Sequence, residues 1–301
     1  MKIKTNLKVI KNYKIYFAVS LAVIIIGFAL AGIRGFNFGI DFTGGTLIEM
    51  NMGKYVESSE IRAITDKIDK NMQINYIGEN RDGIQLKTIV DLNNEKRTEL
   101  FNEFAEKYSL DKNDLVKSDQ FGPAVGKEIQ QKALLSVVIA TLAMLVYISF
   151  RFKFDFGVAA IPALLHDVLV VIAIYAIFRI PLNNPFVAAM LTVVGYSIND
   201  TIVVFDRIRE NMRGAKRDSH EEVADLSINQ TLSRSINTSL TTLLSIVALY
   251  IMGVDSIKEF TLPLIAGISV GVYSSIFIAS PIWVLINKKQ RKKQIQNISA
   301  N

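Results

Sequence analysis

The segment GYSINDTIVVFDRIREN, residues 195–211, begins inside an apolar run and ends in a group of charged residues. Asn199 and Asp200 lie within the apolar part, whereas Asp206 and Arg207 lie at its exit. A carboxylate at membrane depth is energetically costly, so it usually has a partner and a function. Asp200 is therefore the first candidate functional residue of the chain.

The composition of the whole chain is that of a membrane protein. It has 301 residues, half of them hydrophobic, and a mean hydropathy of +0.30. A helix needs about 20 apolar residues to cross a bilayer. We therefore predict a polytopic α-helical membrane protein with six spans. The predicted spans are 15–33, 133–150, 156–178, 186–205, 236–254 and 262–286.

The first apolar run could be read as a secretory signal, because it follows a basic segment and contains Ala29-Leu30-Ala31. The run from Ile15 to Ile33 is longer than the apolar part of a signal peptide, which has about 7–15 residues. We therefore predict that it is retained as the first span.

Lysine and arginine gather on one side of the predicted spans. The N-terminal segment 1–14, the link 206–235 and the tail 287–301 are basic, whereas the opposite short links contain only Arg179 and Lys258. The positive-inside rule places both termini in the cytoplasm. The net charge of +6 thus indicates topology and contact with membrane lipids, not nucleic-acid binding. The absence of cysteine excludes disulfides and cysteine nucleophiles.

Residues 34–132 then form one extracytoplasmic α/β domain between the first and second spans. Alternating polarity predicts strands at 46–51, 74–77 and 84–89, with a last strand at 115–117. Helices are predicted from Ser58 or Ser59 to about Lys70, and after a cap at Asn93 or Asn94. This order of strands and helices predicts a ferredoxin-like sheet.

The link 206–235 is too long for a plain loop. Val223, Leu226, Ile228 and Leu232 recur at roughly helical spacing. They predict an amphipathic helix on the cytoplasmic surface.

The motif GIDFTGGT, residues 39–46, follows the first span and contains Asp41, Gly44 and Gly45. Adjacent glycines permit backbone conformations that other residues avoid, so we interpret the motif as a tight entry into the first strand. It lacks the spacing of a phosphate-binding loop.

The third predicted span contains His166 and Asp167 near its middle. The pair could serve helix packing through hydrogen bonds, or it could form part of an ion path, which is the usual role of ionisable groups inside a membrane. The residue types alone leave both interpretations open.

Asp200 is predicted to lie in the inner half of the membrane, with Asn199 beside it as a donor and acceptor. Arg234 begins the fifth span at a similar depth and is a candidate partner, although it could also be an interfacial arginine that extends to the headgroups. A carboxyl that alternates between burial and an arginine can take up and release a proton. Gly195 opens this stretch, and Gly267 and Gly271 form a GxxxG pattern that predicts close helix packing in the sixth span.

Several motifs together resemble the SecF family, the smaller membrane subunits of the bacterial SecD/SecF complex in the RND superfamily. They are GIDFTGG (39–45), FGPAVGKE (121–128), LHD (165–167), VGYSINDTIVVFDRIREN (194–211) and RSINTS (234–239). The resemblance implies a non-enzymatic subunit of the bacterial plasma membrane that pairs with SecD and assists late protein export through SecYEG. It also implies contact with the translocating polypeptide, and YajC as a further candidate partner.

The resemblance further implies coupling to the proton motive force, with Asp200 and Arg234 in ion coupling, no cofactor, and sodium as an alternative ion. An RND-type small-molecule or lipid transporter half remains an alternative, although such chains usually carry a second large loop and here the link 253–261 is short. An aspartyl protease using Asp167 and Asp200, and a scaffold for SecD, are two others.

Overall fold

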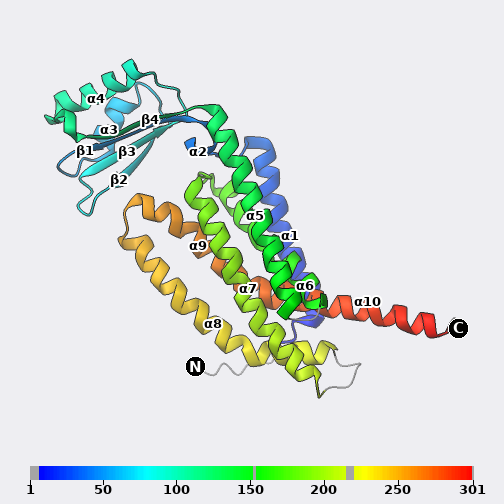
Figure 1. Cartoon of the computed structure of the whole chain (residues 1–301). Helices are drawn as coiled ribbons and strands as arrows, with labels where there is room; N and C mark the ends of the chain where they lie inside the picture. Colours follow the sequence, from blue (N-terminus) through cyan, green and yellow to red (C-terminus); the bar gives the residue numbers. More distant parts are fainter. Residues whose placement is uncertain (1–6, 152–153, 215–219, 300–301) are drawn as a thin grey trace.

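Six long helices dominate the computed structural model, which describes residues 7–151, 154–214 and 220–299 (Figure 1). They are α1 (Tyr13–Arg34), α5 (Pro123–Arg151), α6 (Phe154–Phe178), α7 (Asn184–Met212), α8 (His220–Met252) and a last helix in three parts. The last helix consists of α9 (Asp255–Ser274), a π-helical turn (Ser275–Ala279) and α10 (Ser280–Ser299). By length and hydropathy the described residues contain six candidate membrane spans, so the chain is a multi-pass membrane protein.

The helices extend beyond the predicted spans, because a hydropathy window finds only their apolar parts. Helix α5 begins at Pro123, a residue favoured at the first helical position. Helix α9 begins at Asp255, so the segment predicted as a short link is already helical. Residues 1–6, 215–219 and 300–301, on which parts of the predicted basic segments fall, and residues 152–153 lie outside the described residues.

The predicted amphipathic helix in the link 206–235 is not a separate surface helix. Its described part continues from α7 to Met212 and into α8 from His220. Val223, Ile228 and Leu232 are buried against the helix bundle, whereas Leu226 is half exposed. The apolar face therefore packs within the protein, which explains the imperfect spacing.

An α/β region lies between α1 and α5. Its elements are α2 (Ile40–Thr43), β1 (Gly45–Asn51), α3 (Ser58–Thr65), β2 (Gln73–Ile77), β3 (Gly83–Thr88), α4 (Asn94–Tyr108), a 3-10 turn (Lys112–Asp114) and β4 (Leu115–Phe121). The predicted order of strands and helices is present, and all neighbouring strands are antiparallel in the order β2-β3-β1-β4. Asn93 caps α4 by accepting a hydrogen bond from the Lys96 N–H at 3.0 Å. The cap predicted at Ser58 or Ser59 is wrong, because Glu57 holds that position without a side-chain bond.

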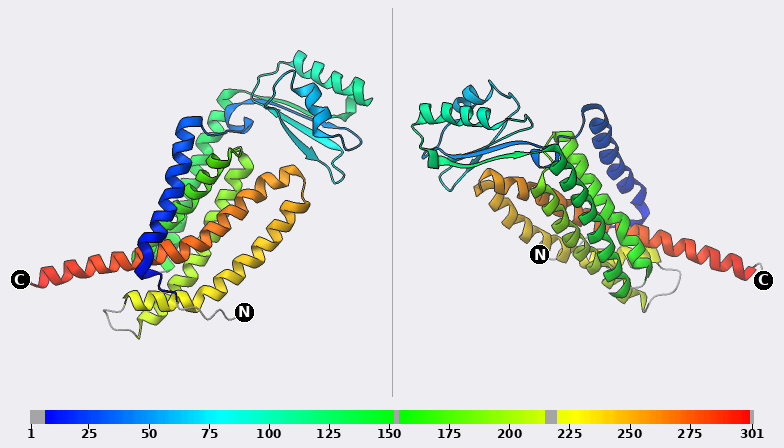
Figure 2. Two further views of the ribbon diagram at one scale, coloured as in Figure 1. Left: turned by 180° about the vertical axis from the view of Figure 1, so that it is seen from behind. Right: turned by 45° about the horizontal axis from the view of Figure 1, so that its top comes forward.

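The two faces of the sheet differ in chemistry. One face carries Ile48, Met50, Ile84 and Leu86, which are buried with apolar residues of α3 and α4. The other face is polar and turns toward the ends of α7 and α9 (Figure 1). The α/β region lies at one end of the helix bundle, and the start of α1 and helix α10 lie at the opposite end (Figures 1 and 2).

Helix α9 occupies the centre of the bundle, where it packs against α6, α7 and α8. A short 3-10 turn (Ile10–Asn12) precedes α1 and packs against the foot of α8. Many large apolar side chains of α1, α5 and α8 remain exposed on the outside of the bundle, as is expected for surfaces that meet lipid or another membrane subunit.

Candidate functional site

Asp167 lies at the meeting point of three helices. It projects from α6 and is 1% exposed. Ser197 of α7 donates its hydroxyl to Asp167 Oδ2 at 2.5 Å, and Ser274 of α9 donates to the same oxygen at 2.9 Å. His166 Nδ1 lies 3.0 Å from Oδ1. One carboxylate thus ties together α6, α7 and α9, so any change in its charge acts on all three helices.

His166 belongs to the same group. It is 8% exposed, and its ring stacks on Tyr273 with centroids 6.0 Å apart. Among the described residues its second ring nitrogen, Nε2, has no hydrogen-bond partner. The His166 ring is thus part of the buried polar group around the Asp167 carboxylate.

Close approach of α7 and α9 makes this arrangement possible. A Cβ atom on Gly267 would lie 2.3 Å from Val193 Cγ2, and one on Gly271 would lie 3.1 Å from Ser197 Cβ. Small residues at helix contacts let backbones approach closely in membranes. The structure therefore places both residues of the predicted GxxxG pattern at the contact that carries Ser197.

The last helix changes from α-helical to π-helical winding at the end of α9, directly after this contact. Residues Ser275–Ala279 form a π-helical turn, and such turns occur frequently at functional sites. The hydroxyls of Ser275 and Thr201 are 2.8 Å apart, and Thr201 in turn donates to the Ser197 carbonyl at 3.2 Å. The hydroxyl groups around Asp167 thus continue along α7 toward the next carboxylate.

Asp200 forms a second buried carboxylate, 2% exposed. Its Oδ2 accepts a hydrogen bond from Ser239 Oγ of α8 at 2.9 Å. Arg234 is exposed, and within the described part of the chain no ion pair joins it to Asp200. Asn199 is also exposed, because neighbouring residues of a helix point in different directions. The structure brings Asp200 together with a serine rather than with the two predicted polar neighbours.

The glycine motif shapes the junction between the bundle and the sheet. Gly44 and Gly45 have positive φ angles of 81° and 144°, and a Cβ on Gly45 would lie 2.2 Å from the Thr88 carbonyl oxygen. Asp41 Oδ2 accepts a hydrogen bond from the Asn184 N–H at 2.9 Å, at the start of α7. By contrast, a Cβ on Gly195 would meet only Met144, at 4.0 Å, so close packing does not require glycine there.

Sequence reasoning did not assign the hydroxyl partners of the two carboxylates. Ser197 and Ser274 donate to Asp167, and Ser239 donates to Asp200, whereas the hydroxyls of Thr201 and Ser275 hydrogen-bond to each other. All are buried. The available signal was the presence of small hydroxyl residues within apolar runs. Ser197 lies three residues before Asp200, and Ser274 and Ser275 lie three and four residues after Gly271.

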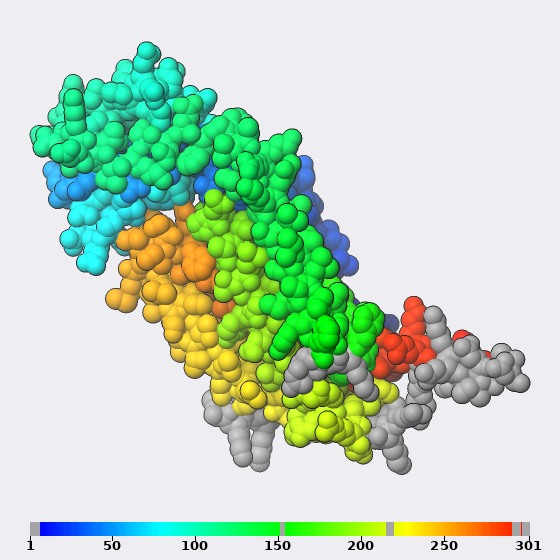
Figure 3. All heavy atoms as spheres, viewed as in Figure 1, coloured from blue at the N-terminus to red at the C-terminus, as the bar shows by residue number. Residues whose placement is uncertain are grey.

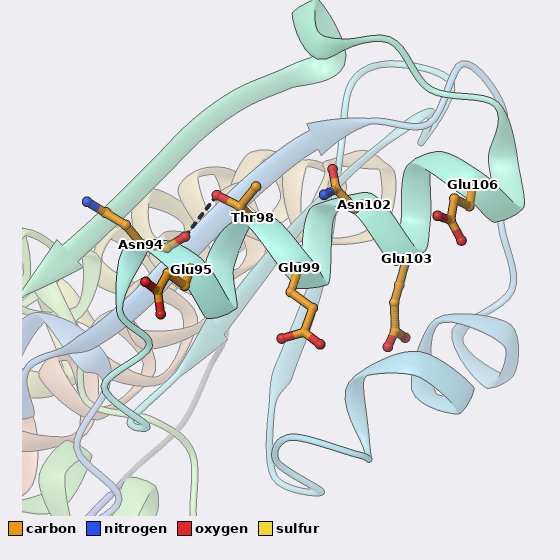
Figure 4. Close-up of a pocket in the computed structure, with 7 residues that line it drawn as sticks. All are labelled: Asn94, Glu95, Thr98, Glu99, Asn102, Glu103 and Glu106. Atoms are coloured by element: carbon orange, nitrogen blue, oxygen red, sulfur yellow. Dashed lines mark hydrogen bonds between the residues drawn. The ribbon is translucent and has the colours of Figure 1, made fainter.

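Another charged surface lies far from these carboxylates in sequence. The exposed face of α4 carries Glu95, Glu99, Glu103 and Glu106, with Thr98 bonded to the Asn94 carbonyl (Figure 4). A row of exposed carboxylates on one helix is ordinarily a solvated surface. We assign no binding site to it.

Comparison with known proteins identifies the family. Residues 102–289 match the family described as protein export membrane protein SecD/SecF, C-terminal, and residues 29–56 match the SecD/SecF GG motif. The protein translocase subunit SecF of Sebaldella termitidis is 38% identical, over 97% of this chain and 96% of the relative. The chain belongs to the SecD/SecF family. Its GG motif is the pair Gly44 and Gly45 described above.

Solved structures of the SecD/SecF family have the same fold. The crystal structure of SecDF from Thermus thermophilus superposes with a TM-score of 0.80 and 35% identity, covering 96% of this chain and 40% of that one. SecDF in a super-membrane-facing form gives a TM-score of 0.73 at 33% identity, covering 99% of this chain and 41% of that one. This chain therefore corresponds to about two fifths of the longer SecDF chains.

Proposed function

We propose that this chain is a SecF-type accessory subunit of the Sec translocase, which pairs with a SecD subunit and uses an ion gradient to assist late protein export. The names of its relatives and the presence of both parts in one SecDF chain support this function. SecYEG, YajC and the translocating polypeptide are proposed as further partners. The proposed role is transport rather than enzymatic catalysis.

The observation that carries the proposal is the pair of buried carboxylates in the centre of the bundle. An ionised carboxylate only accepts hydrogen bonds, whereas a protonated one also donates. Ser197 and Ser274 both donate to Asp167 Oδ2. A proton on this oxygen would make it a donor, so one of the two hydroxyls would have to accept instead of donate. We propose that this exchange alters the contact of α6 with α7 or α9.

The energy that a membrane potential supplies is large enough to drive such a change in helix contacts. One elementary charge that crosses the membrane yields about 2.3 kcal/mol per 100 mV. A shift of about 5.5 kcal/mol moves a two-state equilibrium from about 1:99 to 99:1. Two or three protons at ordinary membrane potentials are therefore enough to drive a conformational cycle. A sodium ion bound by the same oxygens is the alternative coupling ion.

Arg234 and Asn199 are given a role at a subunit contact rather than as direct partners of Asp200. Both are exposed, and the polar residues Thr238 and Thr241 are exposed on the same face of α8 as Arg234. A polar face is unfavourable against lipid. We propose that the SecD subunit covers this face and that Arg234 acts in ion coupling from there.

The proposed orientation places the α/β region outside the cytoplasm of a bacterial cell, with the chain in the plasma membrane. Its βαββαβ order and β2-β3-β1-β4 sheet support a ferredoxin-like domain between the first two spans. Basic residues gather around the first turns of α8, at the opposite end of the bundle (Figure 1). Lys8 and Lys11 lie beside Glu221 there, Lys288 pairs with Glu221, and Arg207 donates to Gln230. The positive-inside rule assigns that end, with both termini, to the cytoplasm.

The test is export into inverted vesicles that contain the chain with its SecD subunit, after ATP is exhausted and under a proton or a sodium gradient alone. Asp167→Asn and Asp200→Asn are expected to abolish the gradient-dependent part of export. Asp206→Asn is the matched control, since Asp206 lies on the same helix but is 53% exposed beside Arg209. Gradient-driven export that both Asn variants leave intact would refute the proposal.

A further inference from the structure

Glu259 collects hydrogen bonds from three different elements near the start of α9. Its carboxylate accepts from Gln73 Nε2 at 2.9 Å and Asn75 Nδ2 at 2.7 Å, and it contacts Lys87 Nζ at 3.1 Å. It also accepts from Asn183 Nδ2 at 2.9 Å. The side chains of Glu259 and Lys87 are only 13% and 14% exposed. This is the kind of shielded, fully bonded ion pair in which the loss of one partner is costly.

The sheet presents these donors as one patch. Gln73 of β2 lies opposite Lys87 of β3, and Asn75 follows two residues later on the same face. Beside them the Tyr76 N–H donates to Asp255 Oδ2 at 2.8 Å. The start of α9 therefore meets both the polar face and the edge of the sheet, and Figures 1 and 3 show the sheet lying against this end of the helix.

Glu259 connects the two helices that supply hydroxyls to Asp167, because it lies on α9 and bonds to Asn183 at the start of α7. Glu259 and Ser274 lie on α9, 15 residues apart, which is about 22 Å along a helix. Asn183 is the N-cap of α7, where its Oδ1 accepts from the Phe186 N–H at 3.0 Å, and α7 carries Ser197. A displacement of α7 or α9 at Asp167 would therefore change the position of Asn183 or of Glu259 in this cluster.

We propose that Glu259 is the positioning residue that couples the α/β region to the Asp167 site. Protonation of Asp167 shifts α7 or α9, and the Glu259 cluster transmits the shift to the sheet. The inference rests on the proposed function insofar as Asp167 changes its protonation state. A polar junction suits this role, because hydrogen bonds from amide side chains and a lysine can exchange partners, whereas a large apolar interface would hold the two parts rigidly.

The experiment measures the position of the α/β region directly. The chain has no cysteine, so cysteines introduced at Asn102 of α4 and Met252 of α8, both exposed, give a unique pair of spin labels. Distances are measured by pulsed electron paramagnetic resonance on the full chain with its SecD subunit in lipid nanodiscs. The variants are Glu259→Gln, Glu259→Lys combined with Lys87→Glu, and the control Glu103→Gln, which removes an exposed carboxylate paired with Lys67.

The parent protein and the Glu103→Gln control are expected to give the same main distance. Glu259→Gln should reduce the population at that distance about tenfold relative to displaced positions. The charge exchange at Glu259 and Lys87 should restore it, because the amides of Gln73 and Asn75 can reverse to offer oxygens. An unchanged distance distribution in Glu259→Gln would overturn the proposal.

Coupling is tested by adding Asp167→Asn to each background. We expect Asp167→Asn to shift the distance when Glu259 is present and to have no further effect in Glu259→Gln. A shift that persists without Glu259, or no shift in the parent background, would refute the coupling. Loss of gradient-driven export in Asp167→Asn with an unchanged label distance would refute this inference alone. Unchanged export in both Asp167→Asn and Asp200→Asn would refute the proposed function alone.

Discussion

The contact of Gly267 with Val193 provides a quantitative test of the packing around Asp167. An alanine at position 267 would put its Cβ at 2.3 Å from Val193 Cγ2 and 2.6 Å from Cγ1. Carbon atoms in contact prefer about 3.5–4.0 Å, so α7 and α9 must separate by roughly 1–2 Å to relieve the clash. Overpacking of this kind costs about 1–3 kcal/mol. The separation would also lengthen the Ser274–Asp167 hydrogen bond, now 2.9 Å.

The free energy of unfolding of Gly267→Ala can be measured in mixed micelles, with the fluorescence of the single tryptophan, Trp283, as the signal. Trp283 is buried against Phe156 and reports on loss of tertiary structure. Gly32→Ala is the matched control, since a Cβ on Gly32 would meet nothing within 4 Å. The control should be neutral or more stable by up to about 1 kcal/mol, because alanine is the better helix former.

A double-mutant cycle identifies the cause of any loss. Val193→Ala removes both Cγ atoms that clash and leaves the Cβ of residue 193 at 3.0 Å from a Cβ on residue 267. We expect Gly267→Ala to cost at least about 1 kcal/mol less in the Val193→Ala background than in the parent protein. A Gly267→Ala variant as stable as Gly32→Ala, or additive effects in the cycle, would refute the close contact between α7 and α9.

Three further predictions concern other contacts. Ser239→Ala removes the hydroxyl that donates to Asp200 and should lower the free energy of unfolding by about 1–3 kcal/mol at pH 7, whereas Ser239→Thr should retain most of it. Asn229→Ala removes two hydrogen bonds to the Leu7 backbone and should speed tryptic cleavage after Lys8 or Lys11, with equal rates in variant and parent contradicting that tether. Burial raises the pKa of Tyr76 from 10.0 to about 12. Because the unfolded chain loses this proton first, stability should fall between about pH 10 and pH 12, and Tyr76→Phe should flatten that part of the profile in micelle unfolding.

The sequence was sufficient to predict the features that depend on local composition. Apolar runs of about 20 residues marked the spans, and alternation of polarity marked β1 and β3 within a residue or so of their observed ends. The cap at Asn93 was also predictable, because its side chain satisfies an N–H only three residues away. The Ser58 or Ser59 cap failed because serine at a helix start is a preference that neighbouring contacts can override.

The partners of the buried carboxylates were not predictable in the same way. Ser197 and Ser274 reach Asp167 from helices that are 30 and 107 residues away in sequence. Their approach depends on how closely α7 and α9 pack, which a single sequence expresses only as small residues at intervals. The contacts of Glu259 were not predictable for a related reason, since the hydropathy pattern assigns Glu259 to a short link although it lies in α9.

Helix α8 shows why Ser239 rather than Arg234 faces Asp200. The exposed residues Arg234, Thr238 and Thr241 follow one face of the helix, whereas Ser235 and Ser239 follow another and are 2% exposed. At 100° per residue, positions 234 and 239 differ by about 140° around the axis, so only one of them can face Asp200. A long charged side chain would hold α8 away from α7, but a serine lets the helices approach until its hydroxyl meets the carboxylate at 2.9 Å. In a tightly packed bundle the small polar residue is therefore the better candidate for a buried partner, and the large one for a surface that meets another subunit.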